Sequence, residues 1–422
     1  MYADDLVLLS ETSDGLQNCL SKLNQYCEEW GLQVNVKKTK CMIFNNTGKL
    51  VATNLKYNNF FIENVRNYCY LGIKFSITGS FTEAKQNLYN RGLKAYFKLK
   101  KCFEYHKPKI GTILHAFDHT VKPILLYGSE IWGMLDTNRL NKFKDNYFQK
   151  LCNDLVIEKL HIKVCKYILE VSRRSTNLAV MGELGRYPLY LEVILNMIKY
   201  WVRLSKMDDC LAAEALKTSE SLHVNGKKSW VNSIYEIINY FNLDISKVSC
   251  LKVTLKKYLN KIFYFKYKNI WKNSLFNDNK TTSYGNKLRT YRLFKNTFNQ
   301  ENYLKWGSYD QRKAITKFRI SSHCLEIERG RYQNIPVDNR ICKLCSTNIE
   351  NEIHFLLEYP KLQEAREKIL HVLENKYKNI VTLSNDSKFI WLMSAEDSFI
   401  YNQLYLLLNN LFKTRQELLS KQ

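Results

Sequence analysis

Two adjacent carboxylates near the start of the chain are the first residues whose type and spacing indicate chemistry. Asp4 and Asp5 follow Tyr2 and Ala3 and precede four consecutive apolar residues, so we expect both acids within a strand-like segment from Tyr2 to Ser10. Burial and a neighbouring like charge each raise the cost of ionising a carboxyl group. A divalent cation removes that cost, because Mg²⁺ takes oxygen ligands such as one or two carboxylates together with substrate phosphates. Asp-Asp is also common in turns, so these four residues alone favour a polar turn over a metal site.

A second candidate site is a cluster of metal-ligating residues far along the chain. Cys342 and Cys345 are separated by two residues and His354 follows after eight more, which gives the spacing C-x2-C-x8-H. A structural zinc ion takes four ligands in a tetrahedron, and C-x2-C is a turn that points two thiolates at one ion. Three arrangements fit this spacing: an empty cluster of core thiols, zinc held by three side chains and a water, or a fold in which His323 or Cys324 supplies the fourth ligand.

Positive charge is concentrated in residues 251–320. The chain of 422 residues has a formal net charge of +24, and this segment alone holds 17 Lys and Arg against three acids. Such an excess favours a polyanionic partner, most commonly nucleic acid, although A/T-rich codons also enrich lysine without any binding. The interleaved aromatic rings suit stacking on unpaired bases, or equally the core of a helix whose lysines form its solvated face. The candidate nucleic-acid-binding residues are Lys256, Lys257, Lys266, Lys268, Lys272, Arg289, Arg292, Arg312 and Lys313.

The elements that must position these residues change in type along the chain. Over the first 80 residues, short strand candidates accompany one helix whose apolar residues run from Leu16 to Trp30, with Ser13 or Asp14 as its N-cap and Gly31 as its stop. From about Thr82 the apolar period is helical. The strand candidates are 32–35, 41–44, 60–62 and 68–75, and the clearest later helices begin near 82 and cover 109–127 with a break near Pro123, 189–204, 361–378 and 398–418. We therefore expect an α+β chain that is mainly helical.

Taken in order, these motifs resemble the reverse transcriptases of LINE-type (non-LTR) retrotransposons. Tyr2 to Asp5 is similar to their catalytic Y-x-D-D turn, Gly31 to Thr39 to the next palm motif, and Tyr70 to Gly72 to the element that grips the primer. The resemblance runs to about residue 370. The domains that it implies are a truncated palm (1–80), a helical thumb-like region (81–205), a basic helical connector (206–310), a Cys/His knuckle region (311–370) and C-terminal helices (371–422).

The resemblance implies an RNA-directed DNA polymerase that handles RNA and DNA with Mg²⁺. Asp4 would be a metal ligand and Asp5 its neighbouring acid. Lys38 would protonate the departing pyrophosphate, because an ammonium group stabilises negative charge on a leaving group; otherwise it is a solvated surface lysine. The residues placed near the primer or nucleotide are Tyr2, Tyr70, Leu71 and Gly72.

Two departures from the family pattern shape the functional prediction. The family has a further metal-binding Asp well upstream of the tetrad, whereas the tetrad here ends at Asp5. We therefore expect a C-terminal fragment that binds nucleic acid but is inactive alone, with the missing N-terminal polymerase half as a partner. In the knuckle, the family's fourth ligand is a Cys, and this position holds Tyr359, whose neutral hydroxyl is a poor zinc ligand. The alternatives are a non-catalytic nucleic-acid-binding module and a helical interaction protein.

The remaining expectations concern the compartment. No apolar run approaches the length of a membrane span, and the first residues have no signal-peptide pattern. We expect an intracellular protein, nuclear or cytoplasmic, with no membrane partner. Its 12 cysteines are then expected to be reduced thiols.

Overall fold

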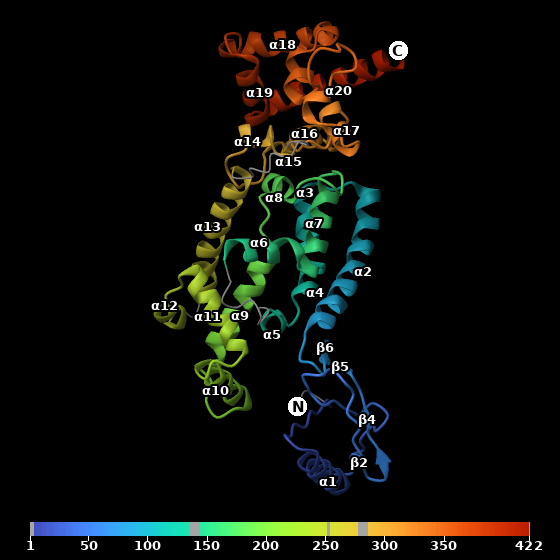
Figure 1. Ribbon diagram of the computed structural model, residues 1–422, viewed down its shortest axis with the longest axis vertical. Coiled ribbons are helices and arrows are strands. Elements are labelled where there is room, and N and C mark those ends of the chain that lie inside the picture. Colours follow the sequence, from blue (N-terminus) through green and yellow to red (C-terminus); the bar gives the residue numbers. More distant parts are fainter. Residues whose placement is uncertain (1–3, 135–143, 251–253, 277–285, 422) are drawn as a thin grey trace. The chain divides into compact units, whose positions relative to one another are not determined.

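The structure is a computed structural model that describes residues 4–134, 144–250, 254–276 and 286–421 (Figure 1). It confirms the predicted fold class, because helices dominate and the strands are short. The chain divides into two compact units, Met1–Asn90 and Arg91–Gln422. The finer division into palm, thumb, connector, knuckle and C-terminal helices stays a prediction.

The first unit combines one long helix with three two-stranded sheets. Helix α1 (Ser13–Glu29) has Thr12 as its N-cap, whose side chain accepts a hydrogen bond from the Gly15 amide. It ends just before Gly31, which adopts a positive φ of 64° that glycine tolerates without strain. The predicted helix is thus confirmed, with its cap one residue earlier. The strands are β1 (Lys40–Cys41) parallel to β4 (Glu63–Asn64), β2 (Lys56–Tyr57) antiparallel to β3 (Phe60–Phe61), and β5 (Asn67–Tyr70) antiparallel to β6 (Ile73–Ser76).

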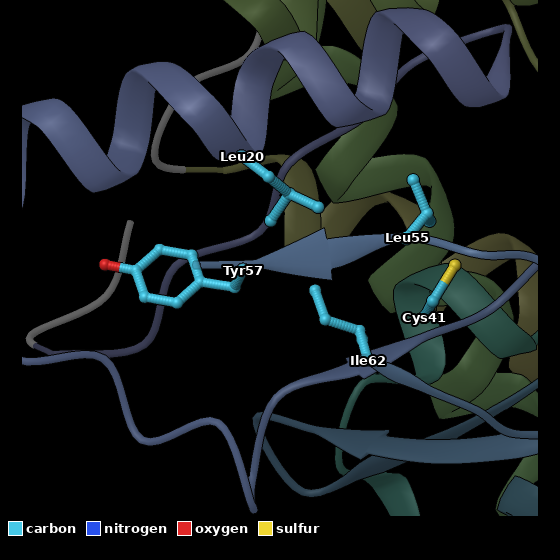
Figure 2. Close-up of a cluster of buried hydrophobic side chains, with 5 residues drawn as sticks. All are labelled: Leu20, Cys41, Leu55, Tyr57 and Ile62. Atoms are coloured by element: carbon cyan, nitrogen blue, oxygen red, sulfur yellow. The ribbon is translucent and has the colours of Figure 1, made fainter. Parts of the chain in front are cut away.

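The core of the first unit lies under α1. Leu20 points from the helix toward Ile62, with Leu55, Tyr57 and Cys41 beside them (Figure 2). Gln17 fixes the helix on β2, because its side-chain amide donates to the Lys56 carbonyl and accepts from the Lys56 amide, both at 2.9 Å. The spacing of apolar residues that predicted the helix is therefore also what buries it.

Two of the predicted strands do not form. Residues 6–10 contain no regular element, and residues 32–35 contain none either. An apolar run becomes a strand only where a neighbouring strand satisfies its backbone, and Leu6, Val7 and Leu9 are exposed side chains in this unit. The predicted strand 68–75 is instead a hairpin, since β5 and β6 pair across a two-residue turn.

The second unit is an assembly of helices. Pro123 lies in the first turn of α4, which explains the predicted break between α3 and α4, and the predicted helices at 189–204, 361–378 and 398–418 are α9, α18 and α20. The α-helices, beginning with one that starts in the first unit, are α2 (Thr82–His106), α3 (Ile110–Thr120), α4 (Lys122–Leu126), α5 (Ser129–Trp132), α6 (Asp145–Asp154), α7 (Val156–Ile168), α8 (Asn177–Leu184), α9 (Tyr190–Leu204), α10 (Leu211–Val224), α11 (Trp230–Phe241), α12 (Ile245–Cys250), α13 (Leu255–Phe276), α14 (Tyr291–Phe294), α15 (Tyr303–Trp306), α16 (Tyr309–Arg319), α17 (Glu326–Tyr332), α18 (Gln363–Lys376), α19 (Asn385–Ser394) and α20 (Ser398–Ser420).

Helix α20 organises the part of this unit that holds the cysteine cluster. It packs against α16, α18 and α19, and its Leu404, Leu407 and Leu411 are fully buried. Among the described residues, no helix is both long and apolar enough to cross a membrane. The described cysteines are free thiols, as expected.

Candidate metal centre and nucleic-acid interface

A tight turn brings the two cysteines of the knuckle together. Ile341 and Ile349 form an antiparallel bridge, and the Cys342 amide donates to the Asn348 carbonyl at 2.8 Å. The Ser346 amide donates back to the Cys342 carbonyl at 2.8 Å, with Ser346 itself at a left-handed φ of 58°. The turn therefore folds Cys345 back toward Cys342, as the C-x2-C spacing predicts.

His354 completes a group of three convergent ligand atoms. The Sγ atoms of Cys342 and Cys345 and a ring nitrogen of His354 lie within 4.8 Å of one another. The Cys345 Sγ and His354 Nε2 are 3.5 Å apart. Zn–S and Zn–N bonds of about 2.3 and 2.0–2.1 Å at a tetrahedral angle also separate sulfur and nitrogen by about 3.5 Å. The three side chains thus fit a zinc ion.

A π-helical turn places His354 and Tyr359 on the same side. Residues His354–Glu358 form η3, a π-helix, and the Tyr359 amide donates to the His354 carbonyl at 2.9 Å. Residues five apart diverge on an α-helix, whereas an i→i+5 bond stacks them. The two rings are accordingly 5.6 Å apart between centroids. This is the interval of the H-x4-C spacing expected from the resemblance, so Tyr359 lies beside His354 where a fourth ligand was expected.

The protonation of the two thiols differs. Burial raises the pKa of Cys345, but hydrogen bonds from the Thr347 hydroxyl and from the Asn348 and Thr347 amides outweigh it and lower the pKa to about 6. Burial raises the pKa of Cys342, partly offset by backbone hydrogen bonds from Cys345 and Leu344. Cys345 is therefore the ready thiolate, which is the form that binds zinc.

Tyr359 cannot act as an anionic ligand at neutral pH. Its side chain is 1% exposed, and burial followed by the neighbouring Cys342 holds its pKa above the ordinary value. Its hydroxyl lies beside Cys342 and has no hydrogen-bond partner among the described residues. The alternative ligands do not join the group, because His323 Nε2 lies 2.9 Å from Glu352 and Cys324 is exposed.

Buried ion pairs hold the knuckle against the helices around it. Arg415 of α20 donates twice to Glu350, at 2.7 Å each. Glu350 also lies 3.8 Å from the Cys342 Sγ. His354 Nδ1 lies 3.5 Å from a Glu358 carboxylate oxygen, on the opposite side of the ring from the Nε2 atom that faces Cys345. Sequence reasoning missed Arg415 and Glu358, although the interval of four from His354 to Glu358 was a readable signal.

The acidic pair has a different environment from the one predicted. Asp4 and Asp5 are both exposed, and Tyr2 lies outside the described residues. Among the described residues, the group at Cys342, Cys345 and His354 is the only set of three or more His, Cys, Asp or Glu that converges as metal ligands do. No third described His, Cys, Asp or Glu therefore converges with these two exposed carboxylates. Lys38 is exposed in the turn after Asn35.

Apart from Tyr2, the predicted primer-proximal residues lie in the β5–β6 hairpin. Tyr70 pairs with Ile73 across the turn formed by Leu71 and Gly72. Both turn residues have positive φ, 46° and 79°. This is the type I′ geometry that two-residue hairpins favour, and it holds an exposed Leu71 at the tip.

Helix α13 separates the aromatic rings of the basic segment from its lysines. Its Phe263, Tyr267 and Trp271 are buried at intervals of four, so they are core residues. Phe265, by contrast, is 67% exposed. Lys256, Lys257, Lys268 and Lys272 are exposed. The lysines thus line the solvated face, and Phe265 is the ring on that helix most available to a base.

The other predicted nucleic-acid-binding residues have protein partners. Lys266 lies 3.7 Å from Asp145, and Lys313 lies 3.3 Å from Glu170. Arg289 pairs with Glu328 and Glu352 at 2.7 and 2.6 Å. Arg292 and Arg312 donate to the carbonyls of Leu288 and Gly307, at 3.3 and 2.9 Å.

Comparison with known proteins shows which family the first unit is similar to. Residues 1–75 match the reverse transcriptase (RNA-dependent DNA polymerase) family. Over 154 residues the chain is 25% identical to the RNA-directed DNA polymerase from mobile element jockey of Drosophila melanogaster, a match that covers 34% of this chain and 16% of that protein. Over 162 residues it is 29% identical to the probable RNA-directed DNA polymerase from transposon BS of the same organism, covering 34% of this chain and 17% of that protein.

These matches fix the extent of the similarity. The matched part spans about a sixth of the length of these curated relatives. No solved structure matches the chain. The similarity to reverse transcriptases is therefore established for the first unit and for about a third of the chain, in agreement with the motifs from Asp4 to Gly72.

Proposed function

We propose that this chain is the C-terminal part of a non-LTR retrotransposon RNA-directed DNA polymerase, and that these 422 residues bind nucleic acid without polymerising DNA by themselves. The observation that carries the proposal is the match of residues 1–75 to the reverse transcriptase family. The similarity to the jockey and BS polymerases supports the retrotransposon type.

The proposed inactivity rests on the acidic pair. Asp4 and Asp5 would hold Mg²⁺ in an intact enzyme, but both are exposed and no third ligand of the described residues converges with them. Polymerisation then requires a further metal-binding acid from outside these 422 residues, and Lys38 would act on the leaving pyrophosphate only when that acid is present. Misplacing reacting groups by about 1 Å already costs roughly 100-fold in rate.

Zinc is the proposed structural cofactor of the second unit. Cys342, Cys345 and His354 would hold the ion, with a water or the Tyr359 hydroxyl at the fourth position. The ion would link the C-x2-C turn to η3 and so fix the knuckle. Metal analysis of the purified protein, with Cys342→Ser as the comparison, is expected to find zinc in the wild type alone.

Two measurements on the purified chain test the proposed function. Single-stranded RNA should bind at low salt, and the affinity should fall roughly 10³-fold between 50 and 200 mM salt if about six phosphate contacts form. The same protein with primed RNA template, dNTPs and Mg²⁺ should extend no primer. Clear extension would overturn the proposed inactivity, and absence of RNA binding would overturn the proposed affinity.

The second candidate function is a non-catalytic nucleic-acid-binding module. The observation that favours it is the location of the exposed α13 lysines and the Cys/His group in the second unit, apart from residues 1–75. A module of this kind would bind single-stranded RNA and a primed template equally well. A polymerase remnant would prefer the primed template.

A further inference from the structure

Five cations from four separate segments meet near the two carboxylates Glu328 and Glu352. Arg289 reaches both acids, at 2.7 and 2.6 Å. Lys287 Nζ and Arg331 Nε lie 3.9 and 3.4 Å from the same Glu328 oxygen. Lys166 of α7 and Arg174 of the loop after α7 complete the group, because Lys166 and Lys287 both donate hydrogen bonds to carbonyl groups of that loop. We call Lys166, Arg174, Lys287, Arg289 and Arg331 the basic cluster.

The loop at 173–174 connects the cations. Lys287 Nζ donates to the Arg174 carbonyl at 3.4 Å, and Lys166 Nζ donates to the Arg173 carbonyl at 2.9 Å. Both ammonium groups are therefore bonded to neutral carbonyl oxygens of one short loop. No carboxylate of the described residues forms an ion pair with Lys166 or Arg174.

The basic cluster carries more positive charge than its carboxylates balance. Five cations against two carboxylates leave a surplus of three. Glu352 also has partners outside the cluster, because its Oε1 accepts from Ser321 and lies 2.9 Å from His323. Glu328 is shared by Lys287, Arg289 and Arg331. An added anion would lower the electrostatic free energy of this arrangement.

The protonation of the two lysines reflects the same surplus. Burial lowers the pKa of Lys287; Glu328 opposes this, and the charges of Arg331, Arg289 and Arg174 lower it further. Burial and then Lys287 lower the pKa of Lys166. Cations are thus held close together in a partly dry site, where a phosphate group would be bound more strongly than at the open surface.

An exposed aromatic ring adjoins the cluster. The Arg174 guanidinium lies 5.0 Å from the centroid of the Tyr332 ring, and Tyr332 is 48% exposed. An unpaired base can stack on such a ring, whereas a base inside a duplex cannot. A group of cations beside an exposed ring is therefore suited to a single strand.

We propose that the basic cluster binds the phosphate backbone of single-stranded nucleic acid, with an unpaired base on Tyr332. The inference rests on the proposed nucleic-acid affinity. It adds a second group of binding residues to the exposed lysines of α13. Arg174 and Lys287 contact phosphate, and Arg289 stays bound to its two carboxylates and orients the cluster.

The chain offers a matched control for Arg174. Arg203, at the end of α9, is also exposed, and its guanidinium also lies 5.0 Å from a tyrosine ring, that of Tyr200, but it has no place in the cluster. Single-stranded RNA affinity is measured over a range of KCl concentrations for Arg174→Gln and Arg203→Gln in the full chain. Each lost phosphate contact should reduce the salt slope by about 0.7, or about fivefold in affinity at 0.1 M salt.

The expected result is a reduced slope for Arg174→Gln and an unchanged slope for Arg203→Gln. Tyr332→Ala should weaken binding about tenfold and Tyr332→Phe should not, since only the ring face is needed. Equal effects of Arg174→Gln and Arg203→Gln overturn this inference while leaving the proposed function intact. Wild-type protein that binds no RNA at low salt overturns the proposed function itself. Equal binding of a blunt duplex overturns the assignment to single strands.

Discussion

The residue that most affects the candidate zinc site is Tyr359. The π-turn brings it to the cluster, yet its buried hydroxyl is neutral and without a hydrogen-bond partner among the described residues. We predict that Tyr359→Cys, which supplies a third thiolate as the fourth ligand, tightens zinc binding by more than about tenfold. Changes in residues that only contact the ligands already alter metal affinity by about 10–100-fold. Competition with a chromogenic zinc chelator measures the change.

Two companion variants make that prediction specific. Tyr359→Phe removes only the hydroxyl and should leave zinc affinity unchanged if water is the fourth ligand. His354→Ala removes a ligand and should release the metal at chelator concentrations that the wild type withstands. A Tyr359→Cys protein with wild-type affinity would mean that position 359 does not face the ion.

The residues of this site were predictable from spacing only in part. C-x2-C-x8-H named all three converging ligands, because a short turn and a short helix leave few other geometries. The sequence did not reveal Arg415, since its contact with Glu350 spans 65 positions and depends on how α20 packs. Arg289 was predicted to bind nucleic acid, but a charged residue type does not reveal whether a buried acid lies beside it.

At the scale of elements, α13 offers a matched pair of aromatic residues. Phe263 is fully buried and Phe265 is 67% exposed, two positions along the same helix. We predict that Phe263→Ala costs about 3–5 kcal/mol of unfolding free energy, whereas Phe265→Ala costs less than about 0.5 kcal/mol. Urea denaturation measures both. If Phe265 stacks on a base, its variant should lose RNA affinity without losing stability; similar destabilisation by the two variants would contradict the assigned faces of α13.

The β5–β6 hairpin contains a second element-scale test. Leu71 is held at a left-handed φ of 46°, which costs an L-residue about 1–2 kcal/mol. Leu71→Asn creates Asn-Gly, the preferred type I′ pair, and should stabilise the hairpin by about 0.5–1 kcal/mol, whereas Gly72→Ala should destabilise it. Hydrogen exchange of the β5 and β6 amides reports the change. Stabilisation by Gly72→Ala would contradict the turn type.

The elements also show where sequence patterns succeed. Helices were predictable from apolar spacing, and Pro123 marked the break between α3 and α4 because its ring is compatible only with a first turn. The apolar run at 6–9 was a poor guide, since a strand needs a partner and a run of apolar residues does not specify one. The strand predicted at 68–75 concealed a turn whose first residue is leucine, which carries no turn signal.

At the scale of the whole molecule, a buried polar chain should govern how stability depends on pH. Glu158 is completely buried; its carboxylate accepts the Tyr190 amide at 2.6 Å and lies 3.1 Å from His161 Nδ1. His161 Nε2 accepts from Arg186 at 3.1 Å, and Arg186 in turn pairs with Asp118. The contacts of His161 therefore suit its neutral form.

The two pKa values shift in opposite directions. Burial raises the pKa of Glu158 to about 8, against the hydrogen bond from Tyr190 and the charge of Arg186. Burial and then Arg186 hold the pKa of His161 well below 6.5, against the charge of Asp118. In the folded chain Glu158 thus keeps a proton that the unfolded residue releases near pH 4.5. His161 behaves in the opposite way: below about pH 6.5 the unfolded residue binds a proton, whereas the folded residue stays neutral.

Between about pH 4.5 and 6.5 these two contributions nearly cancel, because unfolding releases one proton and binds another. Above pH 6.5 Glu158 contributes a fall in the free energy of unfolding of about 1.4 kcal/mol per pH unit up to about pH 8. The Cys345 thiol, whose pKa is lowered to about 6, contributes a rise of similar size over the same range. We predict that Glu158→Gln, which has no titrating carboxyl, loses only the Glu158 contribution, so that its slope lies about 1.4 kcal/mol per pH unit above that of the wild type, whereas Glu214→Gln on the exposed face of α10 keeps the wild-type slope. Urea unfolding at pH 6.5, 7.25 and 8 measures the slopes. A slope in Glu158→Gln equal to that of the wild type would show that Glu158 does not hold a proton in the folded chain over this range.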